Sequence, residues 1–480
     1  MRRRRFLSIA ATAVVTAALA GCAKRENGPA AGASLAVSAR PQGERQVKIG
    51  LLTTGLEGPR VALQIEQAIQ ELHDAGHALN LSHTLVAAEQ GQGPSALADA
   101  IKKASQEGKQ IDLFFLGQEE EWEFLNGEGL LAPAANVSKS DPDFDPDAYF
   151  PAAIQSVTLD GKMMGLPLWF RPVVVGFEPS AFAEAGVQAP ERDWDWHSFL
   201  EAARRLTVRR PDGSMGRYGF ALSPFLTPAF TYMWQNGGDV LSVDATVSTA
   251  ASPEAVEAVR FMASLVDVDA VVPKLGAGDG PEALTPAFGE GGPTVGGVPV
   301  AMAPFTYGSA FGMQMTTNRS QSGGNVEVDV KVEVRVDERG RALMGPRSGS
   351  SATATLPRNK QAAGLAAPAG MIAVLAASVD PEASWFAAKE LARAVERFGT
   401  VPARRVGEAE LMQRDPSLDA GQARAVLEAA GRARSPLWPR KYELMTVLRE
   451  VVDVPVLRGG ADPAAVLEEA SNRIDRLLQG

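Results

Sequence analysis

The spacing of apolar residues between positions 47 and 116 constrains the fold more than any other feature of this chain. Short apolar runs at 47–52, 81–88 and 111–116 are typical of buried strands, and apolar residues three or four apart at 61–72 and 97–104 indicate one face of a helix each. Strand, helix, strand, helix, strand in this order predicts a parallel sheet covered by helices, and therefore an α/β fold.

Polar residues follow two of these expected strands directly. Thr53 and Thr54 come after the first strand, and Gln118 and Glu119 come after the third. Ligands of parallel sheets bind beyond the carboxyl ends of the strands, so these four residues are candidate ligand contacts. The acidic run that begins at Glu119 has a second interpretation as a solvated helix start, where carboxylates interact favourably with the helix dipole.

The N-terminus predicts an exported and lipid-anchored protein. Arg2 to Arg5 precede an apolar stretch that is too short to span a bilayer, and the stretch ends in Leu-Ala-Gly before Cys22, the single cysteine of the chain. This arrangement resembles the lipobox of bacterial lipoproteins. We therefore expect a signal peptide at 1–21, a lipid on Cys22 and a flexible tether at 22–45; the paired arginines leave general secretion and twin-arginine export both open.

Composition limits the function classes further. The 480 residues carry a net charge of −10, and loss of the leader arginines makes it −14, so an extended nucleic-acid surface is not expected. One cysteine permits no intrachain disulfide. His73, His77 and His83 lie close in sequence, but Gly76 interrupts the helix that would align the first two. We expect no metal site and no cofactor.

Three later helices are signalled at their starts, and one unusual strand follows the middle of the chain. Ser-Pro-Glu at 252–254, Asp-Pro-Glu at 380–382 and Asp-Pro at 462–463 place a capping residue before proline. Valine occupies every even position of 326–336 with charged residues between, which predicts a half-buried strand returning through a turn at 337–340. Charge protection of an edge is the preferred interpretation, and a partner-docking edge is the alternative.

Several segments, in order, carry a resemblance to a known family. They are Ile-Asp-Leu-Phe-Phe at 111–115, Asp-Gly-Lys-Met-Met-Gly-Leu-Pro-Leu at 160–168, Trp-Asp-Trp-His-Ser-Phe at 194–199, Trp-Gln-Asn-Gly-Gly at 234–238, Gly-Val-Pro-Val-Ala-Met at 297–302 and Val-Pro-Ala-Arg at 401–404. Together they resemble family 1 extracellular solute-binding proteins, the maltodextrin-binding-protein-like receptors of ABC importers.

The resemblance implies a two-lobe periplasmic-binding-protein type II fold with three interlobe crossings. The N-terminal lobe would comprise 46–167 plus 305–365, and the C-terminal lobe 168–304 plus 366–480. The ligand would bind between the lobes and favour their closure by a hinge motion. The implied partners are a small-molecule solute and the transmembrane subunits of an ABC permease, and the implied state is a monomer.

Aromatic residues near the expected crossings are candidate sugar contacts. Sugars present apolar C–H faces to aromatic rings and polar edges to planar guanidinium groups. The candidates are Trp169, Phe170, Arg171, Trp234, Phe305 and Tyr307. Packing in the hinge or core is the alternative for each aromatic residue.

Two classes of function remain open from the sequence. The first is a non-enzymatic receptor that captures a sugar or oligosaccharide outside the cytoplasmic membrane, with a phosphate-bearing polyol as an alternative ligand because Arg171 and a helix entry near Thr53 suit an anion. The second is an envelope enzyme, a lyase or hydrolase acting on glycans. A ligand-binding sensor subunit is a third and weaker possibility. The chain contains no Gly-x-Ser-x-Gly elbow and no phosphate-binding loop ending in Lys-Ser/Thr, which favours the receptor.

Overall fold

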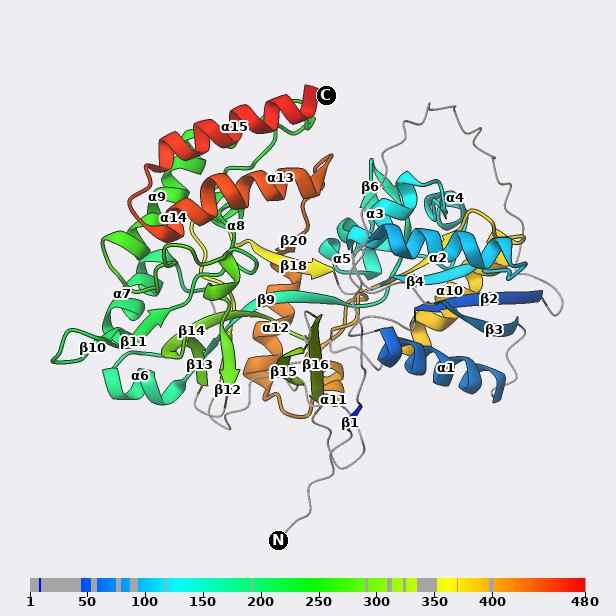
Figure 1. Ribbon diagram of the computed structural model, residues 1–480, viewed down its shortest axis with the longest axis horizontal. Helices are drawn as coiled ribbons and strands as arrows, with labels where there is room; N and C mark the ends of the chain where they lie inside the picture. The colour runs from blue at the N-terminus through cyan, green and yellow to red at the C-terminus, as the bar shows by residue number, and fades with distance from the viewer. Residues whose placement is uncertain are drawn as a thin grey trace, which may run out of the picture.

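A computed structural model gives the arrangement of the chain (Figure 1). It describes residues 8–9, 45–52, 58–74, 79–86, 94–116, 119–190, 193–289, 292–308, 313–322, 325–334, 352–368, 370–396 and 401–479. Cys22 and nearly all of the expected signal peptide and tether lie outside these residues. None of the described helices is long and apolar enough to cross a membrane.

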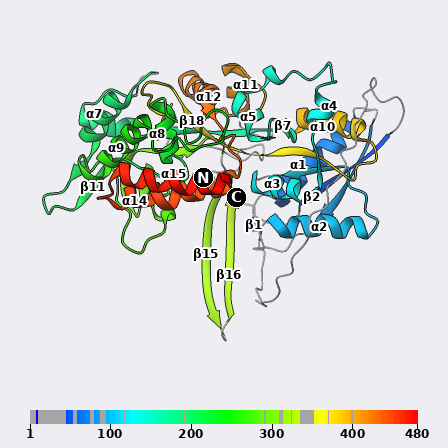
Figure 2. The same ribbon diagram turned by 90° about the horizontal axis from the view of Figure 1, so that it is seen from above.

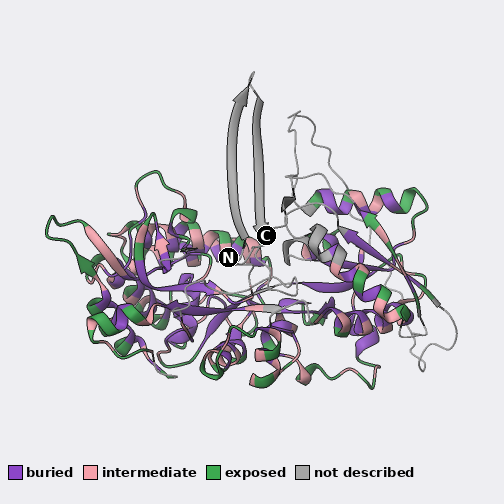
Figure 3. Cartoon of the chain, turned by 90° about the horizontal axis from the view of Figure 1, so that it is seen from below, coloured by how far each residue is buried: buried purple, intermediate pink, exposed green. Residues whose placement is uncertain are grey.

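The predicted strand–helix order of the first lobe is confirmed. Its elements are β2 (Arg45–Leu52), α1 (Gly58–Asp74), β3 (Leu79–Val86), α2 (Pro94–Gln106), β4 (Leu113–Leu116), α3 (Glu119–Gly127), β5 (Leu131–Ala132), α4 (Ala135–Ser138), α5 (Pro151–Ser156), β6 (Thr158–Leu159), β7 (Lys162–Met163) and β8 (Gly165–Pro167). β2 pairs in parallel with both β3 and β4. The apolar faces of α1 and α2 pack on this sheet, with Ile65 and Leu97 in its core. Figure 3 shows buried residues along the strands of both lobes.

The second lobe is built around the long strand β9 (Phe170–Phe177), which pairs with β14 on one side and β18 on the other. Its other elements are α6 (Pro179–Ala185), α7 (Trp196–Leu206), β10 (Val208–Arg209), β11 (Met215–Phe220), α8 (Ala229–Gln235), α9 (Pro253–Asp267), β12 (Ala287–Gly289), β13 (Gly292–Val295), β14 (Val298–Thr306), β17 (Ala352–Ala354), β18 (Gly364–Pro368), α11 (Glu408–Arg414), α12 (Ala420–Arg432), β20 (Ala433–Arg434), α13 (Lys441–Leu448), α14 (Val454–Arg458) and α15 (Pro463–Gln479). Figure 1 shows the two lobes side by side, with β9 running from the junction into the second lobe.

Two segments belong to lobes other than those expected. β17 pairs with β9 in the second lobe, although we expected 305–365 in the first; β18 pairs with β9 through 366–368, which were expected in the second lobe. β19 (Met371–Leu375) pairs with β4, β5 and β8, and α10 (Pro381–Val395) packs on the same sheet, although we expected 366–480 in the second lobe. The reason is that all five residues of β19 are buried, which suits the middle of the first sheet rather than a lobe boundary.

The chain therefore passes between the lobes at three places. The first crossing joins β8 to β9, the second joins β18 to β19, and the third joins α10 to α11. Backbone hydrogen bonds connect the crossings: Leu168 donates to the Gly370 carbonyl at 3.0 Å, and Ala403 donates to the Leu168 carbonyl at 3.0 Å. The second crossing thus lies near Gly370 and not near 304, where the sequence had placed it.

The predicted helix starts are confirmed. The Ser252 side chain accepts a hydrogen bond from the Ala255 backbone at the start of α9, and Asp380 accepts one from Ala383 at the start of α10. Helix α15 begins at Pro463, as the Asp-Pro pair indicated. These caps satisfy donors that the first helical turn leaves without intrahelical partners.

The valine-rich strand forms, and it has a partner that the sequence analysis did not name. β16 (Asn325–Val334) pairs antiparallel with β15 (Met313–Ser322), which precedes it, and also with the leader strand β1 (Ser8–Ile9). The expected turn at 337–340 and the return at 341–344 lie outside the described residues. Figure 2 shows the β15–β16 hairpin projecting from the body. An upstream partner needs only a short connection, which explains why an antiparallel hairpin forms there.

Candidate ligand-binding site at the junction of the lobes

Two strand ends of the first sheet meet at one edge beside the crossings. β2 and β4 are parallel neighbours, with Ile49 opposite Leu113 and Gly50 opposite Phe114. A Cβ on Gly50 would lie 2.3 Å from the Phe114 ring, so glycine is what lets the ring lie directly against β2. The carboxyl ends of the two strands therefore project to the same edge, where the candidate ligand contacts were expected.

The four polar candidates follow these two strand ends. Thr53 and Thr54 come directly after β2, and Gln118 comes two residues after β4. All three lie outside the described residues, and Glu119 is described only as the first residue of α3. The structure therefore shows the two strand ends at one sheet edge, and the position of the four residues and their role as ligand contacts stay a prediction.

Trp169 lies between the two lobes at the first crossing. Its side chain is 7% exposed, and its ring centroid lies 5.9 Å from that of Phe115. It also forms a backbone bridge with Pro402 of the third crossing. Gly370, with φ of 147°, leaves space here, because a Cβ would lie 2.9 Å from Phe115 and 3.5 Å from the Trp169 Nε1. Trp169 is therefore mainly a packing residue of the hinge in this conformation.

Phe170 and Arg171 open the second-lobe strand β9 next to this hinge. Phe170 pairs with Pro368 and Arg171 with Ala367, so both lie beside the second crossing as well as the first. The Arg171 side chain is half-buried; that of Phe170 lies outside what the structure describes. Their position at two crossings keeps both as candidate contacts.

The structure corrects the expectation that Trp234, Phe305 and Tyr307 present open faces to a ligand. They are 1%, 1% and 2% exposed. Trp234 packs edge-on against Phe230, at 4.9 Å between ring centroids, and the Tyr307 hydroxyl hydrogen-bonds the Asp415 carboxylate. Each ring lies at the end of an apolar element that carries it into the core, so burial outweighs its nearness to the junction.

A polar cluster that the sequence analysis missed lies around the edge of Trp234. The Arg434 guanidinium stands 4.6 Å from the Trp234 ring centroid and bonds Asp239 at 3.0 Å, while the Trp234 Nε1 donates to the other Asp239 oxygen at 2.9 Å. Asp239 and Arg434 are 34% and 41% exposed. The next residue, Ser435, donates from its backbone to Gln155 of α5, so the cluster lies near the junction.

The cluster escaped detection because its members come from distant segments. Arg434 is on β20, Asp239 follows α8, and neither has a periodic or motif signal around it. The one available signal is that Arg434 and Trp438 lie four positions apart in the sequence. In the structure Trp438 lies near Trp234, with 6.3 Å between the ring centroids. A half-exposed Arg–Asp pair on an aromatic base can donate and accept hydrogen bonds from hydroxyl groups.

No metal centre emerges from the part of the chain that the structure describes. Within it, no group of three or more His, Cys, Asp or Glu side chains could hold a metal ion. His83 instead pairs with Glu66, with 3.2 Å between the Nε2 and Oε1 atoms. His77 lies outside the described residues.

The family model of the bacterial extracellular solute-binding proteins matches residues 88–396, more than half of the chain. The chain belongs to this family. The match contains β4, β9 and β19, and so covers strands of both lobes and the first two crossings. The resemblance inferred from the sequence motifs is thereby confirmed.

Solved structures of solute-binding proteins share the fold. The cyclic alpha-maltosyl-1,6-maltose binding protein from Arthrobacter globiformis superposes with a TM-score of 0.63 at 16% identity, covering 91% of this chain and 100% of its own. The sugar-binding protein MalE from Xanthomonas citri gives 0.61 at 17% identity, covering 91% and 98%. An ABC substrate-binding protein from Listeria monocytogenes in complex with cycloalternan gives 0.56 at 19% identity, covering 91% and 99%. The two-lobe α/β fold of this family member is that of maltose-binding-protein-type structures.

Curated relatives match over a shorter region. A protein of Brucella abortus (strain 2308), named a putative binding protein, is 31% identical over 113 residues, which are 23% of this chain and 26% of the relative. The chain thus spans about a quarter of the length of the curated relatives it matches. This similarity is consistent with the family and adds nothing on the ligand.

Proposed function

We propose that the protein is the non-enzymatic substrate-binding component of an ABC importer, which captures a sugar or oligosaccharide and delivers it to the permease. The observation that carries the proposal is family membership combined with two lobes joined by three hydrogen-bonded crossings. Such a junction suits a hinge, and a ligand that contacts both lobes favours the closed state. The sugar-binding proteins that share the fold support a carbohydrate as the ligand.

The proposed site combines the sheet edge of the first lobe with the start of β9. We assign to it Thr53, Thr54, Gln118, Glu119, Phe170 and Arg171, together with Trp169 at the first crossing and the Asp239–Arg434 pair of the second lobe. Threonine, glutamine and carboxylate side chains suit sugar hydroxyls, and a phenylalanine ring suits their C–H face. Arg171 would also serve a phosphate-bearing polyol, the alternative ligand.

A binding screen tests this function directly. Thermal unfolding of the full chain is followed with mono- and oligosaccharides, polyols and sugar phosphates, and a ligand that binds the native state raises the midpoint by mass action. Calorimetry on each hit then gives the stoichiometry, and chromatography of the recovered ligand shows whether it is unchanged. One sugar bound per chain and recovered intact is the expected result. Turnover of the sugar would instead establish the glycan-active enzyme.

Replacing Phe170 by alanine is expected to weaken sugar affinity by about ten- to a hundredfold, which corresponds to the roughly 1–3 kcal/mol of a stacked ring. Gln118→Ala is expected to weaken it by a smaller factor, since a single neutral hydrogen bond contributes about 1 kcal/mol. Calorimetry with the screened sugar measures both. Phe124→Ala is the control, because Phe124 lies on α3 of the first lobe and is 37% exposed. Equal affinity of all three variants and the wild type would show that the site lies elsewhere.

Replacing Cys22 by serine is expected to abolish lipid attachment, because it removes the sulfur that would be acylated. The variant should remain an unprocessed precursor and move to the aqueous phase in detergent phase separation, while the wild type stays with the detergent. Sugar affinity should be unchanged, since Cys22 precedes both lobes. Retention of the serine variant in the detergent phase would contradict the lipid anchor.

A further inference from the structure

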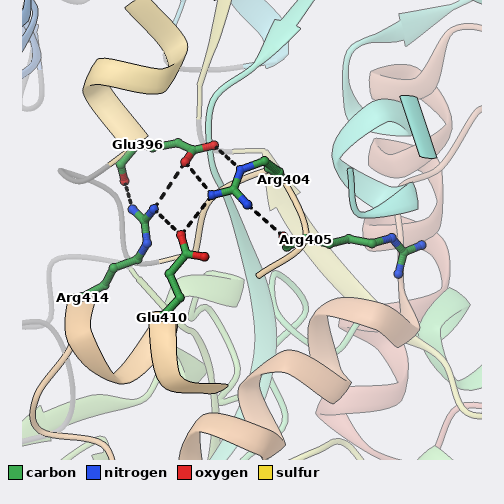
Figure 4. Close-up of polar contacts among 5 residues, drawn as sticks. All are labelled: Glu396, Arg404, Arg405, Glu410 and Arg414. Atoms are coloured by element: carbon green, nitrogen blue, oxygen red, sulfur yellow. Dashed lines mark hydrogen bonds and ion pairs between the residues drawn. The ribbon is translucent and has the colours of Figure 1, made fainter. Parts of the chain in front are cut away.

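Four charged side chains form a closed ring at the third crossing, which we call the ion-pair cage: Glu396, Arg404, Glu410 and Arg414 (Figure 4). Arg404 reaches both carboxylate oxygens of Glu396, at 3.2 Å from Nε and 3.1 Å from Nη2, and contacts Glu410 at 3.0 Å. Arg414 contacts the same two glutamates, at 3.3 Å and 2.8 Å. Acid and base therefore alternate around the ring, and its net charge is zero.

The cage joins elements of different lobes. Glu396 follows α10, whose residues Leu391 and Val395 belong to the core of the first lobe. Arg414 closes α11, which contributes Leu411 to a core cluster made mostly of second-lobe residues such as Val174 of β9, with Ala152 of the first-lobe helix α5 also in it. The chain between Glu396 and α11 is the third crossing, so the ion pairs link the two ends of this crossing.

Helix geometry strengthens this link. Glu396 sits at the C-terminal end of α10, where the helix dipole disfavours a carboxylate and favours a cation. Arg414 donates from Nη1 to the Glu396 backbone carbonyl at 2.5 Å, and so supplies the cation as well as a partner for an end carbonyl. The Glu396 carboxylate is stable at this position because two guanidinium groups bond it.

Burial separates the cage from ordinary surface pairs. The side chains of Glu396 and Arg414 are 15% and 14% exposed, whereas Arg404 and Glu410 form the outer side at 41% and 36%. Burial would raise the pKa of the Glu410 carboxyl, but hydrogen bonds and charge from Arg414 and Arg404 hold it below its usual value. The hydrogen bond that Arg404 donates to Glu396, together with the charge of that carboxylate, raises the pKa of Arg404. These shifts favour the charged forms of Glu410 and Arg404, and charge networks of this kind contribute more than isolated exposed pairs.

The crossings beside the cage are already connected through their backbones. Arg404 forms a backbone bridge with Tyr149, and Arg405 points away from the cage and donates to the backbone carbonyls of Asp147 and Tyr149 (Figure 4). Among the described residues, which exclude 397–400, the only backbone contact between the end of α10 and α11 is the hydrogen bond that Arg414 donates to the Glu396 carbonyl. The side chains of the cage therefore carry the connection at this crossing.

We propose that the ion-pair cage restrains the relative orientation of the two lobes and thereby raises the apparent affinity for the ligand. Without it, α10 and α11 are connected through the chain between them and through the contacts of Arg404 and Arg405 with 147–149, and the lobes sample a wider set of orientations. A smaller fraction of the free protein then has the binding-competent arrangement, and the apparent affinity falls by that fraction. The effect on affinity rests on the proposed function, but the effect on lobe orientation does not.

The test measures lobe orientation in the absence of ligand. Spin labels on cysteines introduced at Gln70 of α1 and Glu468 of α15, both exposed, report the interlobe distance distribution by pulsed electron paramagnetic resonance in the full chain carrying Cys22→Ser. Glu396→Gln, which keeps the side-chain shape and removes the charge, is expected to broaden the distribution. Arg404→Gln is expected to do the same from the opposite side of the cage, and Glu396→Asp is expected to restore part of the wild-type distribution.

Glu408→Gln is the matched control. Glu408 makes a similar two-point contact with Arg424, at 2.8 Å and 3.2 Å, but this pair joins α11 to α12 within the second lobe. The interlobe distance distribution of Glu408→Gln should match that of the wild type. Equal distributions for Glu396→Gln, Arg404→Gln and the wild type would overturn the proposal, and so would equal broadening by Glu408→Gln.

The same variants give the effect on affinity. With a sugar that binds the wild type, Glu396→Gln is expected to bind about three- to tenfold more weakly, and Glu408→Gln as tightly as the wild type. Broadening without loss of affinity would overturn the part of the proposal that concerns ligand affinity. If the wild type binds no sugar, the proposed function fails, while the distance measurement still decides whether the cage restrains the lobes.

Discussion

Trp234→Ala is expected to lower the free energy of unfolding by about 3–5 kcal/mol, the usual cost of deleting a large buried aromatic side chain. The Trp234 ring is 1% exposed and contacts Phe230 and the Arg434 guanidinium, and its Nε1 bonds Asp239. The truncation would therefore open a cavity in the second lobe and release the Asp239–Arg434 pair from its aromatic support. Urea unfolding followed by circular dichroism measures the change.

Leu437→Ala provides the control for this prediction, because Leu437 is 54% exposed and lies in the same region of the second lobe. Its stability should stay within about 0.5 kcal/mol of the wild type. If Trp234→Ala were as stable as the control and had lost sugar binding, the residue would be a stacking contact in another conformation, and the core assignment would be wrong.

Asp453→Asn is expected to stabilise the protein at alkaline pH by several kcal/mol and to flatten its pH dependence. Asp453 is 1% exposed and accepts a hydrogen bond from the Ala229 backbone at the start of α8, at 2.8 Å. Burial raises its pKa from 3.8 to about 7, against the lowering effects of that hydrogen bond and of the Arg449 charge; Tyr232 also faces it. Asparagine keeps an oxygen acceptor for Ala229 and carries no charge.

The sign of the pH effect follows from proton linkage. With its pKa raised by folding, the native state binds more protons than the unfolded state between pH 3.8 and about 7. The contribution of Asp453 to the free energy of unfolding is therefore complete below pH 3.8 and is lost as pH rises to about 7. On this basis the free energy of unfolding of the wild type falls by on the order of 3 kcal/mol between pH 5 and pH 8 through this group. That of Asp453→Asn does not fall through this group. Urea unfolding at both pH values measures it; parallel losses in the two proteins would contradict the assignment.

The sequence was sufficient for the parts of the fold that depend on local patterns. The strand–helix order of 45–116 and the starts of α9, α10 and α15 follow from apolar spacing and from capping residues, which act over a few neighbours in the chain. The ordered family motifs, and not any single one of them, indicated two lobes. The first crossing, between β8 and β9, was also placed where the chain makes it.

The lobe assignment of later segments could not be read in this way. β18 and β19 are both short and apolar, and only two residues separate Gly364–Pro368 from Met371–Leu375, yet they join different sheets. Which sheet a strand joins depends on the partner edges that are free, and those edges are set by residues 200 positions away.

In the candidate site, too, some features follow from local sequence and others depend on tertiary packing. The sequence alone determined that Thr53, Thr54, Gln118 and Glu119 follow strand ends, because strand ends are local features, and the structure then shows β2 and β4 as parallel neighbours whose ends lie at one sheet edge. Only the tertiary structure decided that Trp234, Phe305 and Tyr307 are buried, and that Arg434 with Asp239 and the four residues of the cage come together. Periodicity reports which face of an element is apolar, whereas burial and charge pairing depend on which distant element packs against that face.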